Sequence, residues 1–442
     1  MLKVGYVGLG AMGSSLSKHL IERFDLMVFD RNPDAIAALV AQGATAALSA
    51  PQLARACDVI VLCLPRTSDV QDALFGINGM ADVLTAGKLV IDQTSGIPQE
   101  TKSIAKDLAS RGVAMVDAPL SGGIPAAKNR KVTVIASGPD AAWATAEPVL
   151  LAMTESVFRC SDRVGDAQAL KLVNNATGAG YRMATLELVA LGRKMGLSLP
   201  LLVQTLNAGE GANFTTRHML VGLVEGRSTT NFALALMVKD LNAALALGAV
   251  THAAMPMTTS ARALMQTGLN LFGKTAVLDD VIPLIERLSD VKFKTGEGEF
   301  LQSTNVISAD DLLTLIDHAA MACNAIAVCE CVAMGHKYGL PMLQMARILN
   351  VGSAWSKVSE HILPSLASGS TPQLALTFKN AQSALATVFQ LAAQFGVPLT
   401  LPGTALNLLG LVAGTFDGSD VNFGTIVRSF DGILDQQQSK AT

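Results

Sequence analysis

The feature that most constrains folding is a glycine-rich turn at the start of the chain. It lies between a strand-like apolar stretch, residues 2–7, and a helix-like stretch, residues 14–21. In a G-x-G-x-x-G turn the first glycine allows a tight turn, the second lets the backbone approach a pyrophosphate, and the third lets helix pack on strand. Free N–H groups at the start of the helix then attract phosphate. The sequence predicts a dinucleotide site whose turn residues are Gly8, Gly10, Ala11, Met12 and Gly13.

A glycine turn with a purely structural role would have the same sequence, so its neighbours decide the interpretation. A second apolar run, residues 26–29, ends at Asp30, seventeen residues after Gly13. A carboxylate at this point accepts hydrogen bonds from an adenosine ribose and repels a 2′-phosphate. Asp30 therefore predicts a preference for NAD(H). The adjacent Arg31 could pair with a 2′-phosphate, so NADP(H) stays open as an alternative.

Short apolar runs alternate with helix-like segments as far as about residue 160. Residues 59–64, 89–92, 114–117 and 132–135 are continuous Val/Ile/Leu-rich runs. Such runs are expected of strands in a parallel sheet that is covered on both faces. We therefore expect a doubly wound α/β domain of the Rossmann type over residues 1–162.

After Asp166 the chain is rich in Ala, Leu and Met and predicts helices only. It contains an internal repeat at an offset of 143 residues, with copies at about 164–290 and 309–434. Twelve residues recur in register: Ala184, Glu187, Val189, Ala190, Gly192, Lys194, Gly196, Leu197, Leu206, Asn207, Gly209 and His218 return as Ala327, Glu330, Val332, Ala333, Gly335, Lys337, Gly339, Leu340, Leu349, Asn350, Gly352 and His361. The polar piece 292–304 reads as a linker. We expect two helical domains, 163–293 and 305–442.

Composition excludes several classes of protein. The richest apolar segment, residues 319–335, is interrupted by Asn324 and Glu330, and the N-terminus has no leader pattern, so we expect a cytoplasmic protein without a membrane partner. A net charge of −3 with mixed signs predicts no nucleic-acid partner. The cysteines show no metal-binding spacing, so we expect no metal and six reduced thiols: Cys57, Cys63, Cys160, Cys323, Cys329 and Cys331.

Three loops that follow predicted strands carry polar or glycine residues. Residues 117–123 read Asp-Ala-Pro-Leu-Ser-Gly-Gly, in which Ser121 offers a hydroxyl and Gly122 and Gly123 let N–H groups approach an anion. An ordinary Ser-Gly loop is an equally good interpretation of this segment alone. Residues 64–67 and 93–96 follow two further strands, so they would lie at the same edge of the sheet as the glycine turn.

The first long helix carries a lysine and an amide on one otherwise small and apolar face. Lys171 and Asn175 are four residues apart, and Gly178 and Arg182 continue this face. Burial lowers the pKa of a lysine and suits it to proton transfer near neutrality. On the helix alone, a lysine that reaches the surface is slightly favoured. The segment Lys239-Asp240-Leu241 reads, on spacing alone, as a solvated charge pair.

These segments, in this order, resemble the β-hydroxyacid dehydrogenase family, which includes 3-hydroxyisobutyrate dehydrogenase and tartronate semialdehyde reductase. The resemblance covers residues 1–291 and rests on the glycine turn, residues 117–123, residues 165–175 and residues 239–241. It implies that Lys171 is the catalytic lysine and that Asn175 positions the substrate oxygen. It also implies substrate-carboxylate binding by Ser121, Gly122 and Gly123, and cofactor contacts from Leu64, Pro65, Thr94 and Lys239.

The chain departs from the family at two points. Arg130 stands where the family usually has a glycine. Arginine is a large cation and could change which substrates the neighbourhood of the pocket accepts. The extra helical copy resembles the duplicated helical domain of 6-phosphogluconate dehydrogenase, whereas the resemblance implies homodimers for short members of the family. In the second copy, Lys171, Asn174 and Asn175 correspond to Thr314, Asp317 and His318, so we expect this copy to be structural.

Together these features predict an NAD-dependent oxidoreductase that interconverts a small β-hydroxy acid and its semialdehyde, with Lys171 as general acid and base. The substrate is expected to be a small carboxylate. An imine reductase would share the architecture, but by resemblance that class lacks a lysine at position 171. A non-catalytic nucleotide-binding protein would need the glycine turn but no proton donor.

Overall fold

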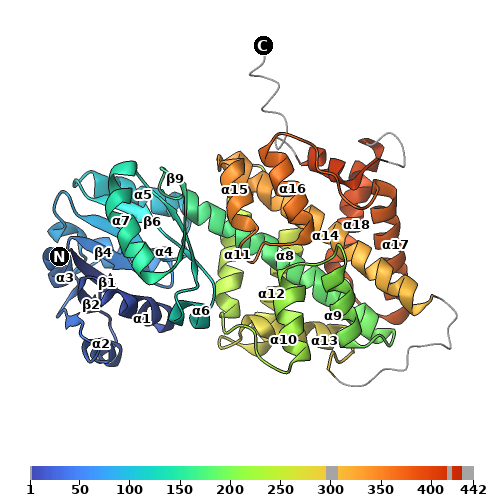
Figure 1. Cartoon of the computed structure of the whole chain (residues 1–442), viewed down its shortest axis with the longest axis horizontal. Helices are drawn as coiled ribbons and strands as arrows, with labels where there is room; N and C mark the ends of the chain where they lie inside the picture. Colours follow the sequence, from blue (N-terminus) through green and yellow to red (C-terminus); the bar gives the residue numbers. More distant parts are fainter. Residues whose placement is uncertain (1, 295–306, 416–420, 431–442) are drawn as a thin grey trace, which may run out of the picture. The chain divides into compact units, whose positions relative to one another are not determined.

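The central strands of the first unit are buried at almost every position, and their side chains point alternately to two faces that are both covered by helices. The computed structural model describes residues 2–294, 307–415 and 421–430, and the chain forms two units, Met1–Lys171 and Leu172–Thr442 (Figure 1). The strands of the first unit are β1 (Lys3–Val7), β2 (Asp25–Phe29), β3 (Thr45–Ala46), β4 (Val59–Leu62), β5 (Leu89–Asp92), β6 (Ala114–Asp117), β7 (Leu120–Ser121), β8 (Thr133–Ser137) and β9 (Ser156–Ser161). Their order is β3-β2-β1-β4-β5-β6-β8-β7, and β9 pairs with β8.

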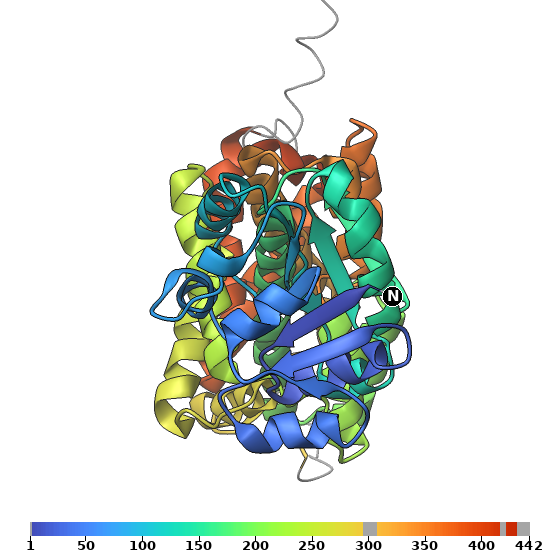
Figure 2. The same ribbon diagram turned by 90° about the vertical axis from the view of Figure 1, so that its left-hand side faces the viewer.

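The strands from β3 to β6 are parallel, as predicted, and the neighbouring pair β1 and β2 is visible in dark blue in Figure 2. The expectation that residues 132–135 belong to a wholly parallel sheet is wrong, because β8 runs antiparallel to β6 and β7. The connection from β6 to β8 holds only the five-residue helix α6 (Ile124–Lys128) and the strand β7, which pairs antiparallel with β8 as in a hairpin, so the chain re-enters the sheet in the opposite direction. An apolar run alone does not reveal the direction of a strand.

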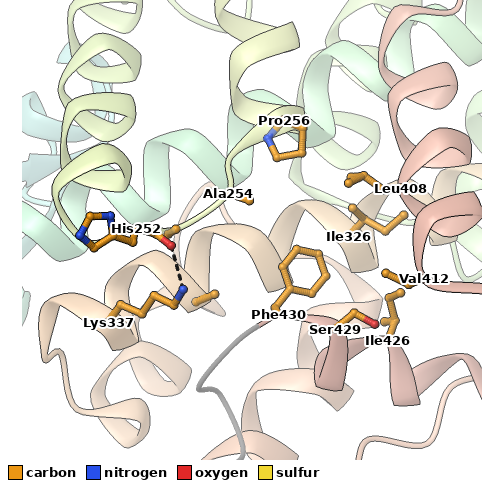
Figure 3. A pocket seen from close by; sticks show the side chains of 12 residues that line it. His252, Ala254, Pro256, Ile326, Lys337, Leu408, Val412, Ile426, Ser429 and Phe430 are labelled. Carbon is orange, nitrogen blue, oxygen red and sulfur yellow. Dashed lines mark hydrogen bonds between the residues drawn. The ribbon is translucent and has the colours of Figure 1, made fainter. Parts of the chain in front are cut away.

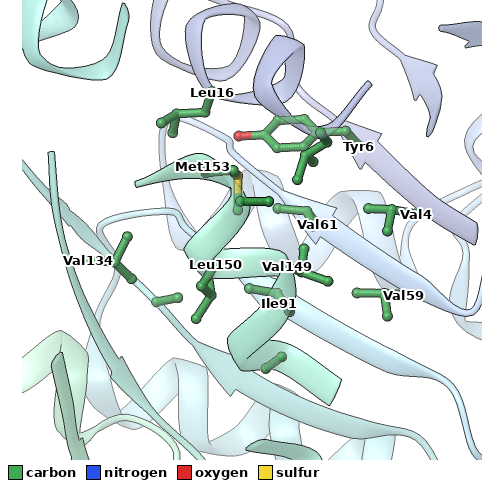
Figure 4. Packing of buried hydrophobic residues seen from close by; sticks show 14 of the residues in the cluster. Val4, Tyr6, Leu16, Val59, Val61, Ile91, Val134, Val149, Leu150 and Met153 are labelled. Atoms are coloured by element: carbon green, nitrogen blue, oxygen red, sulfur yellow. The ribbon is translucent and has the colours of Figure 1, made fainter. Parts of the chain in front are cut away.

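Two clusters of buried side chains lie on opposite faces of this sheet. Val59 and Val61 of β4 pack with helix residues such as Leu16 and Leu150 (Figure 4), whereas Ile60 and Leu62 face the other cluster. The helices on the first face include α1 (Ala11–Ser17), η1 (Lys18–Leu20), α2 (Pro33–Val40), α6 and α7 (Asp140–Met153). Those on the second face are α3 (Ala50–Ala56), α4 (Thr67–Phe75) and α5 (Pro98–Ala109), and the 3-10 turn η2 (Ala81–Val83) lies near them.

The second unit is built of helices among its described residues, with loops and isolated β-bridges between them. Its first copy contains α8 (Asp166–Lys194), whose first residues belong to the first unit, with α9 (Leu199–Ala208), η3 (Thr215–Leu220), α10 (Val221–Val224), α11 (Leu234–Val250), α12 (Pro256–Phe272), η4 (Leu278–Asp280) and α13 (Val281–Leu288). The second copy contains α14 (Ala309–Tyr338), α15 (Met342–Leu349), α16 (Lys357–Ala367), α17 (Phe378–Phe395), α18 (Thr400–Val412), η6 (Ala413–Thr415) and η7 (Phe423–Ser429). Most of the linker predicted at 292–304, and the predicted end of the second copy at 434, lie outside the described residues.

The two copies exchange hydrogen bonds between equivalent positions. Glu187 on α8 accepts hydrogen bonds from Thr400 N and Leu401 N at the start of α18, both at 2.8 Å. Glu330 on α14, 143 residues later, accepts from Met257 N at 2.9 Å and from Thr258 N at 2.6 Å at the start of α12. Each long helix therefore caps a helix of the other copy, which explains why the copies form one unit.

Helix α14 is long and apolar enough to cross a membrane by length and composition, although the sequence analysis found no such segment. Of its most apolar window, 83% is buried inside the helical unit. The two polar residues that interrupt it are both bonded there, because Asn324 binds Asn213 and Glu330 caps α12. In this structure α14 is a core helix of the second unit.

Candidate active site

The glycine turn has the geometry that a dinucleotide requires. Gly8 has φ +96°, and a Cβ on it would overlap the carbonyl of Cys63. A Cβ on Gly13 would overlap Gly8 O, because α1 lies directly against the turn. A Cβ on Gly10 would meet nothing within 4 Å, so the space beside this residue can admit a phosphate. Ala11 and Met12 form the first turn of α1.

Asp30 is held beside this turn by backbone donors. Its Oδ2 accepts from Leu9 N at 2.6 Å and its Oδ1 accepts from Asn32 N at 2.7 Å. Each oxygen keeps a second lone pair with which to accept from a ribose hydroxyl. Arg31 is exposed.

The loops after β4 and β5 are connected to the start of α8. Thr94 Oγ1 accepts from Leu64 N at 3.0 Å, and Pro65 continues that loop. Gln168 donates from Nε2 to Thr94 O and accepts at Oε1 from Gly96 N, both at 2.7 Å. Gln168 was not singled out from the sequence, although it lies in the segment that carries the family resemblance.

Asp117 fixes the start of α8, a role that its sequence does not reveal. Its carboxylate accepts from Ser137 Oγ at 2.5 Å, Gly165 N at 2.9 Å and Gln168 N at 3.0 Å. Burial raises the pKa of Asp117 to about 6, and these hydrogen bonds oppose that rise. Four residues further on, β7 ends at Ser121; Gly122 has φ +126°, and Gly123 precedes α6.

Lys171 and Asn175 are both buried on α8, with 6% and 3% of the residue surface exposed. The interpretation of Lys171 as a lysine that reaches the surface is therefore wrong. Asn175 Nδ2 donates to Asp240 Oδ2 at 2.7 Å, and Asp240 Oδ1 lies 3.2 Å from Lys239 Nζ. Because Asp240 is buried, the solvated-pair interpretation of residues 239–240 is also wrong.

Asn174, the residue before Asn175, forms hydrogen bonds with residues of the second copy. Asn174 Nδ2 donates to Ser353 Oγ at 2.8 Å and to Asn175 Oδ1 at 3.1 Å, and Asn174 Oδ1 accepts from Ala354 N at 3.3 Å. A chain of hydrogen bonds thus runs from the second copy to Asn175 and on to Asp240.

The equivalent position in the second copy makes the reciprocal contact. Asp317 accepts from Glu210 N at 3.0 Å and from Gly211 N at 2.9 Å. Thr314, which replaces Lys171, is exposed, and His318 replaces Asn175. The contacts of Asp317 are those of a residue that holds the copies together.

Arg130 adopts φ +58°, a conformation that glycine reaches without strain. The glycine that the family resemblance implies at this position would adopt this conformation without strain. Its Nη2 donates to Leu151 O at 3.0 Å, and its own carbonyl accepts from Glu155 N at 3.2 Å. The guanidinium therefore contacts the end of α7.

A cavity of about 150 Å³ lies within the second unit, between the start of α12 and helices α14 and α18 (Figure 3). Its lining is largely apolar and includes Ile326, Leu408 and Phe430, with Lys337 Nζ donating to His252 O. None of the predicted site residues lines it. Among the described residues there is no group of three His, Cys, Asp or Glu side chains suited to a metal ion.

Comparison with known proteins identifies the family. Residues 3–162 match the NAD-binding domain of 6-phosphogluconate dehydrogenase. Residues 165–285 and 314–428 each match the NAD-binding domain of NADP-dependent 3-hydroxyisobutyrate dehydrogenase, which confirms the predicted repeat.

Individual relatives agree with these family matches. The chain is 30% identical over 299 residues to 2-(hydroxymethyl)glutarate dehydrogenase of Eubacterium barkeri, covering 99% of that protein and 67% of this one. It is 31% identical to 3-hydroxyisobutyrate dehydrogenase of Pseudomonas aeruginosa, covering 94% of that protein and 63% of this one. The crystal structure of 3-hydroxyisobutyrate dehydrogenase from Salmonella typhimurium is similar, with a TM-score of 0.57, 28% identity, and coverage of 100% of that chain and 64% of this one.

About a third of this chain thus has no counterpart in these shorter relatives. The glycine turn, the helical repeat and the matches to named hydroxy-acid dehydrogenases agree with one another. The chain belongs to the β-hydroxyacid dehydrogenase family of NAD(P)-dependent oxidoreductases.

Proposed function

We propose that this enzyme interconverts a small β-hydroxy acid and its semialdehyde, with NAD(H) as the preferred cofactor and Lys171 as the general acid and base. The observation that carries the proposal is the burial of Lys171 on α8, one turn before Asn175. Burying a lysine costs free energy, so a buried lysine is unusual in a helix that serves only to pack. The names of the relatives, which act on hydroxymethylglutarate, threonate or hydroxyisobutyrate, support the substrate class.

Proton transfer is the step that the protein itself performs. In reduction, Lys171 Nζ donates a proton to the oxygen that becomes the alcohol, and in oxidation it removes that proton. Asn175 donates to the same oxygen and fixes its position, while Asp240 orients the amide of Asn175. Ser121 Oγ and the N–H groups of Gly122 and Gly123 bind the substrate carboxylate, which holds the reacting carbon in one orientation.

The glycine turn, Asp30, Leu64, Pro65, Thr94 and Lys239 are the residues that would hold the cofactor. The open space beside Gly10 and the close packing at Gly8 and Gly13 fit a pyrophosphate. When bound, the nicotinamide supplies or accepts the hydride.

The decisive experiment replaces Lys171 by methionine, which keeps the length and apolar stem of the side chain but has no titratable proton. Loss of a general acid lowers the rate by about a hundred- to ten-thousand-fold. We expect Lys171→Met to lower kcat to this extent while the dissociation constant for NADH stays nearly unchanged.

A matched control is Lys194→Met, because Lys194 ends the same helix and binds Asp290 at the surface of the unit. This variant should keep turnover close to that of the unmodified enzyme. If Lys171→Met retained more than about a tenth of the original turnover, Lys171 would not be the general acid.

A further inference from the structure

A loop of the second helical copy packs directly on α8, beside the proposed catalytic residues. This loop, residues 350–354, joins α15 to α16. A Cβ on Gly178 of α8 would lie 2.8 Å from Ser353 O, and a Cβ on Gly352 would lie 2.5 Å from Asn174 Oδ1. A glycine on each side of the contact therefore lets the backbone of the loop approach the helix at Asn174.

The loop determines which way the amide of Asn174 faces. Its Nδ2 carries two hydrogens, of which one is donated to Ser353 Oγ at 2.8 Å and the other to Asn175 Oδ1 at 3.1 Å. Its Oδ1 accepts from Ala354 N at 3.3 Å. Turning this amide over would place its oxygen against Asn175 Oδ1 and its NH₂ group against the N–H of Ala354. Because Asn174 is 1% exposed, that arrangement would leave buried polar groups unsatisfied.

The amide of Asn175 is held at both of its ends. Asn174 Nδ2 donates to its Oδ1, and its own Nδ2 donates one hydrogen to Asp240 Oδ2 at 2.7 Å. The second hydrogen of Nδ2 is the one that the proposed function assigns to the substrate oxygen. Its direction is therefore set from one side by Asp240 and from the other by Asn174.

The equivalent contact in the other copy holds a loop on a helix without an amide. Asp317 lies 143 residues after Asn174 and accepts from Glu210 N at 3.0 Å and from Gly211 N at 2.9 Å. An ionised carboxylate only accepts hydrogen bonds, so Asp317 cannot donate to the residue that follows it. Packing of the loop on the helix therefore requires an acceptor at this position and no donor.

The two loops differ at the residue that faces this position. Glu210 is the equivalent of Ser353, and its Oε1 lies 2.7 Å from Lys357 Nζ in an ion pair. Ser353 instead places its hydroxyl on Asn174. Both differences, serine for glutamate and asparagine for aspartate, fall on the contact beside Asn175. Together they supply two side-chain hydrogen bonds that lead from the second copy to Asn175.

We propose that Ser353 is a positioning residue of the active site, which acts through Asn174 to hold the amide of Asn175 in the orientation that binds the substrate oxygen. This inference rests on the proposed function, which gives Asn175 that role. A donor that is already aligned needs no reorganisation when the substrate reacts, so its alignment affects kcat more than KM. The second copy thus supports catalysis from 179 residues away without supplying a catalytic residue.

The test removes the hydroxyl of Ser353 and measures NAD⁺-dependent oxidation of the acids named by the relatives: 2-(hydroxymethyl)glutarate, L-threonate and 3-hydroxyisobutyrate. We expect Ser353→Ala to lower kcat by about three- to tenfold, as for one neutral hydrogen bond, with KM nearly unchanged. Ser353→Thr keeps a hydroxyl and should retain most of kcat. Glu210→Ala is the matched control, because it alters the equivalent loop position of the other copy and should leave kcat unchanged.

A double-mutant cycle with Asn175→Ala separates positioning from a general loosening of the fold. If Ser353 acts through Asn175, Ser353→Ala should have little further effect on kcat in the Asn175→Ala enzyme, whereas a structural role would lower kcat by the same factor in both backgrounds. An unchanged kcat in Ser353→Ala, an equal loss in both backgrounds, or an equal loss in Glu210→Ala would refute the role of Ser353 alone. If none of the three acids were oxidised, or if Asn175→Ala kept full turnover, the proposed function itself would fail and the role of Ser353 with it.

Discussion

Glu187 gives the sharpest test of how the two helical copies depend on each other. It is buried on α8 in the first copy, and both of its carboxylate oxygens accept backbone hydrogen bonds at the start of α18 in the second. Glu187→Ala removes both acceptors at once. Helix α18 itself is not altered, so the loss in the free energy of unfolding reports on the contact between the copies.

The expected cost follows from the two N–H groups that lose their acceptor. An unsatisfied buried donor costs about 1–3 kcal/mol, which applies in full to Leu401 N and in part to Thr400 N, whose hydrogen bond is only part-buried, and gives roughly 2–5 kcal/mol together. Part of this is offset because burial already disfavours the carboxylate and raises the pKa of Glu187 to about 7. We expect a loss of about 3 kcal/mol in the free energy of unfolding near pH 6.

Urea unfolding followed by far-UV circular dichroism measures this loss. Glu330→Ala should show a similar or larger loss, because Glu330 also accepts from Thr258 Oγ1. Glu225→Ala is the control, since the side chain of Glu225 is 51% exposed and its surface ion pair with Arg227 contributes at most about 1 kcal/mol. A loss below about 1 kcal/mol for Glu187→Ala would refute the reasoning, because water would then replace the carboxylate without cost.

Three further predictions concern pH, cofactor and truncation. Burial raises the pKa values of Glu187 and Glu330 to about 7, above the value in the unfolded chain. Their contribution to the free energy of unfolding is therefore fully present below about pH 4.5 and is lost as the pH rises through 7. The urea midpoint should fall between about pH 5.5 and 8, and a midpoint that rises would contradict this. Asp30 should make kcat/KM higher with NADH than with NADPH, and Asp30→Ala should reduce that ratio; a preference of the unmodified enzyme for NADPH would show the assignment to be wrong. A chain truncated near Gly296 should aggregate or self-associate, because Glu187 and Asn174 lose their partners in the second copy. The full chain should bind one NADH, measured by calorimetry. A monomeric, fully active truncated chain, or two NADH sites per chain, would contradict the view that the second copy is a packing partner without catalytic residues.

Local patterns were enough to predict the glycine turn and the helical repeat. The turn depends on residues that are adjacent in the chain, and the structure explains Gly8 by a positive φ and Gly13 by the close approach of Gly8 O, whereas Gly10 leaves open space beside the turn. The repeat is visible because the two copies keep the same spacing of small and apolar residues. Strand direction was not predictable. Strand β8 is as apolar as the parallel strands β4, β5 and β6, but it pairs antiparallel with β6.

The candidate site was predicted only as separate segments. The motif containing Lys171 is local, but the burial of that lysine is a property of the folded chain. Asp117 reaches Gln168 across 51 residues, and Asp240 reaches Asn175 across 65, so no periodicity in the sequence joins them.

By itself the sequence determined the order of elements, the dinucleotide turn and the duplication, because these are encoded in the local spacing of glycine and apolar residues. Only the tertiary structure decided which buried polar and charged groups are paired. Asn174 meets Ser353 across 179 residues, and Glu187 meets Leu401 across 214. Arg182 was left without a hydrogen-bond partner for two of its nitrogens among the described residues. Hydrogen bonds of this kind depend on how helices pack, and packing is set by all the contacting surfaces together.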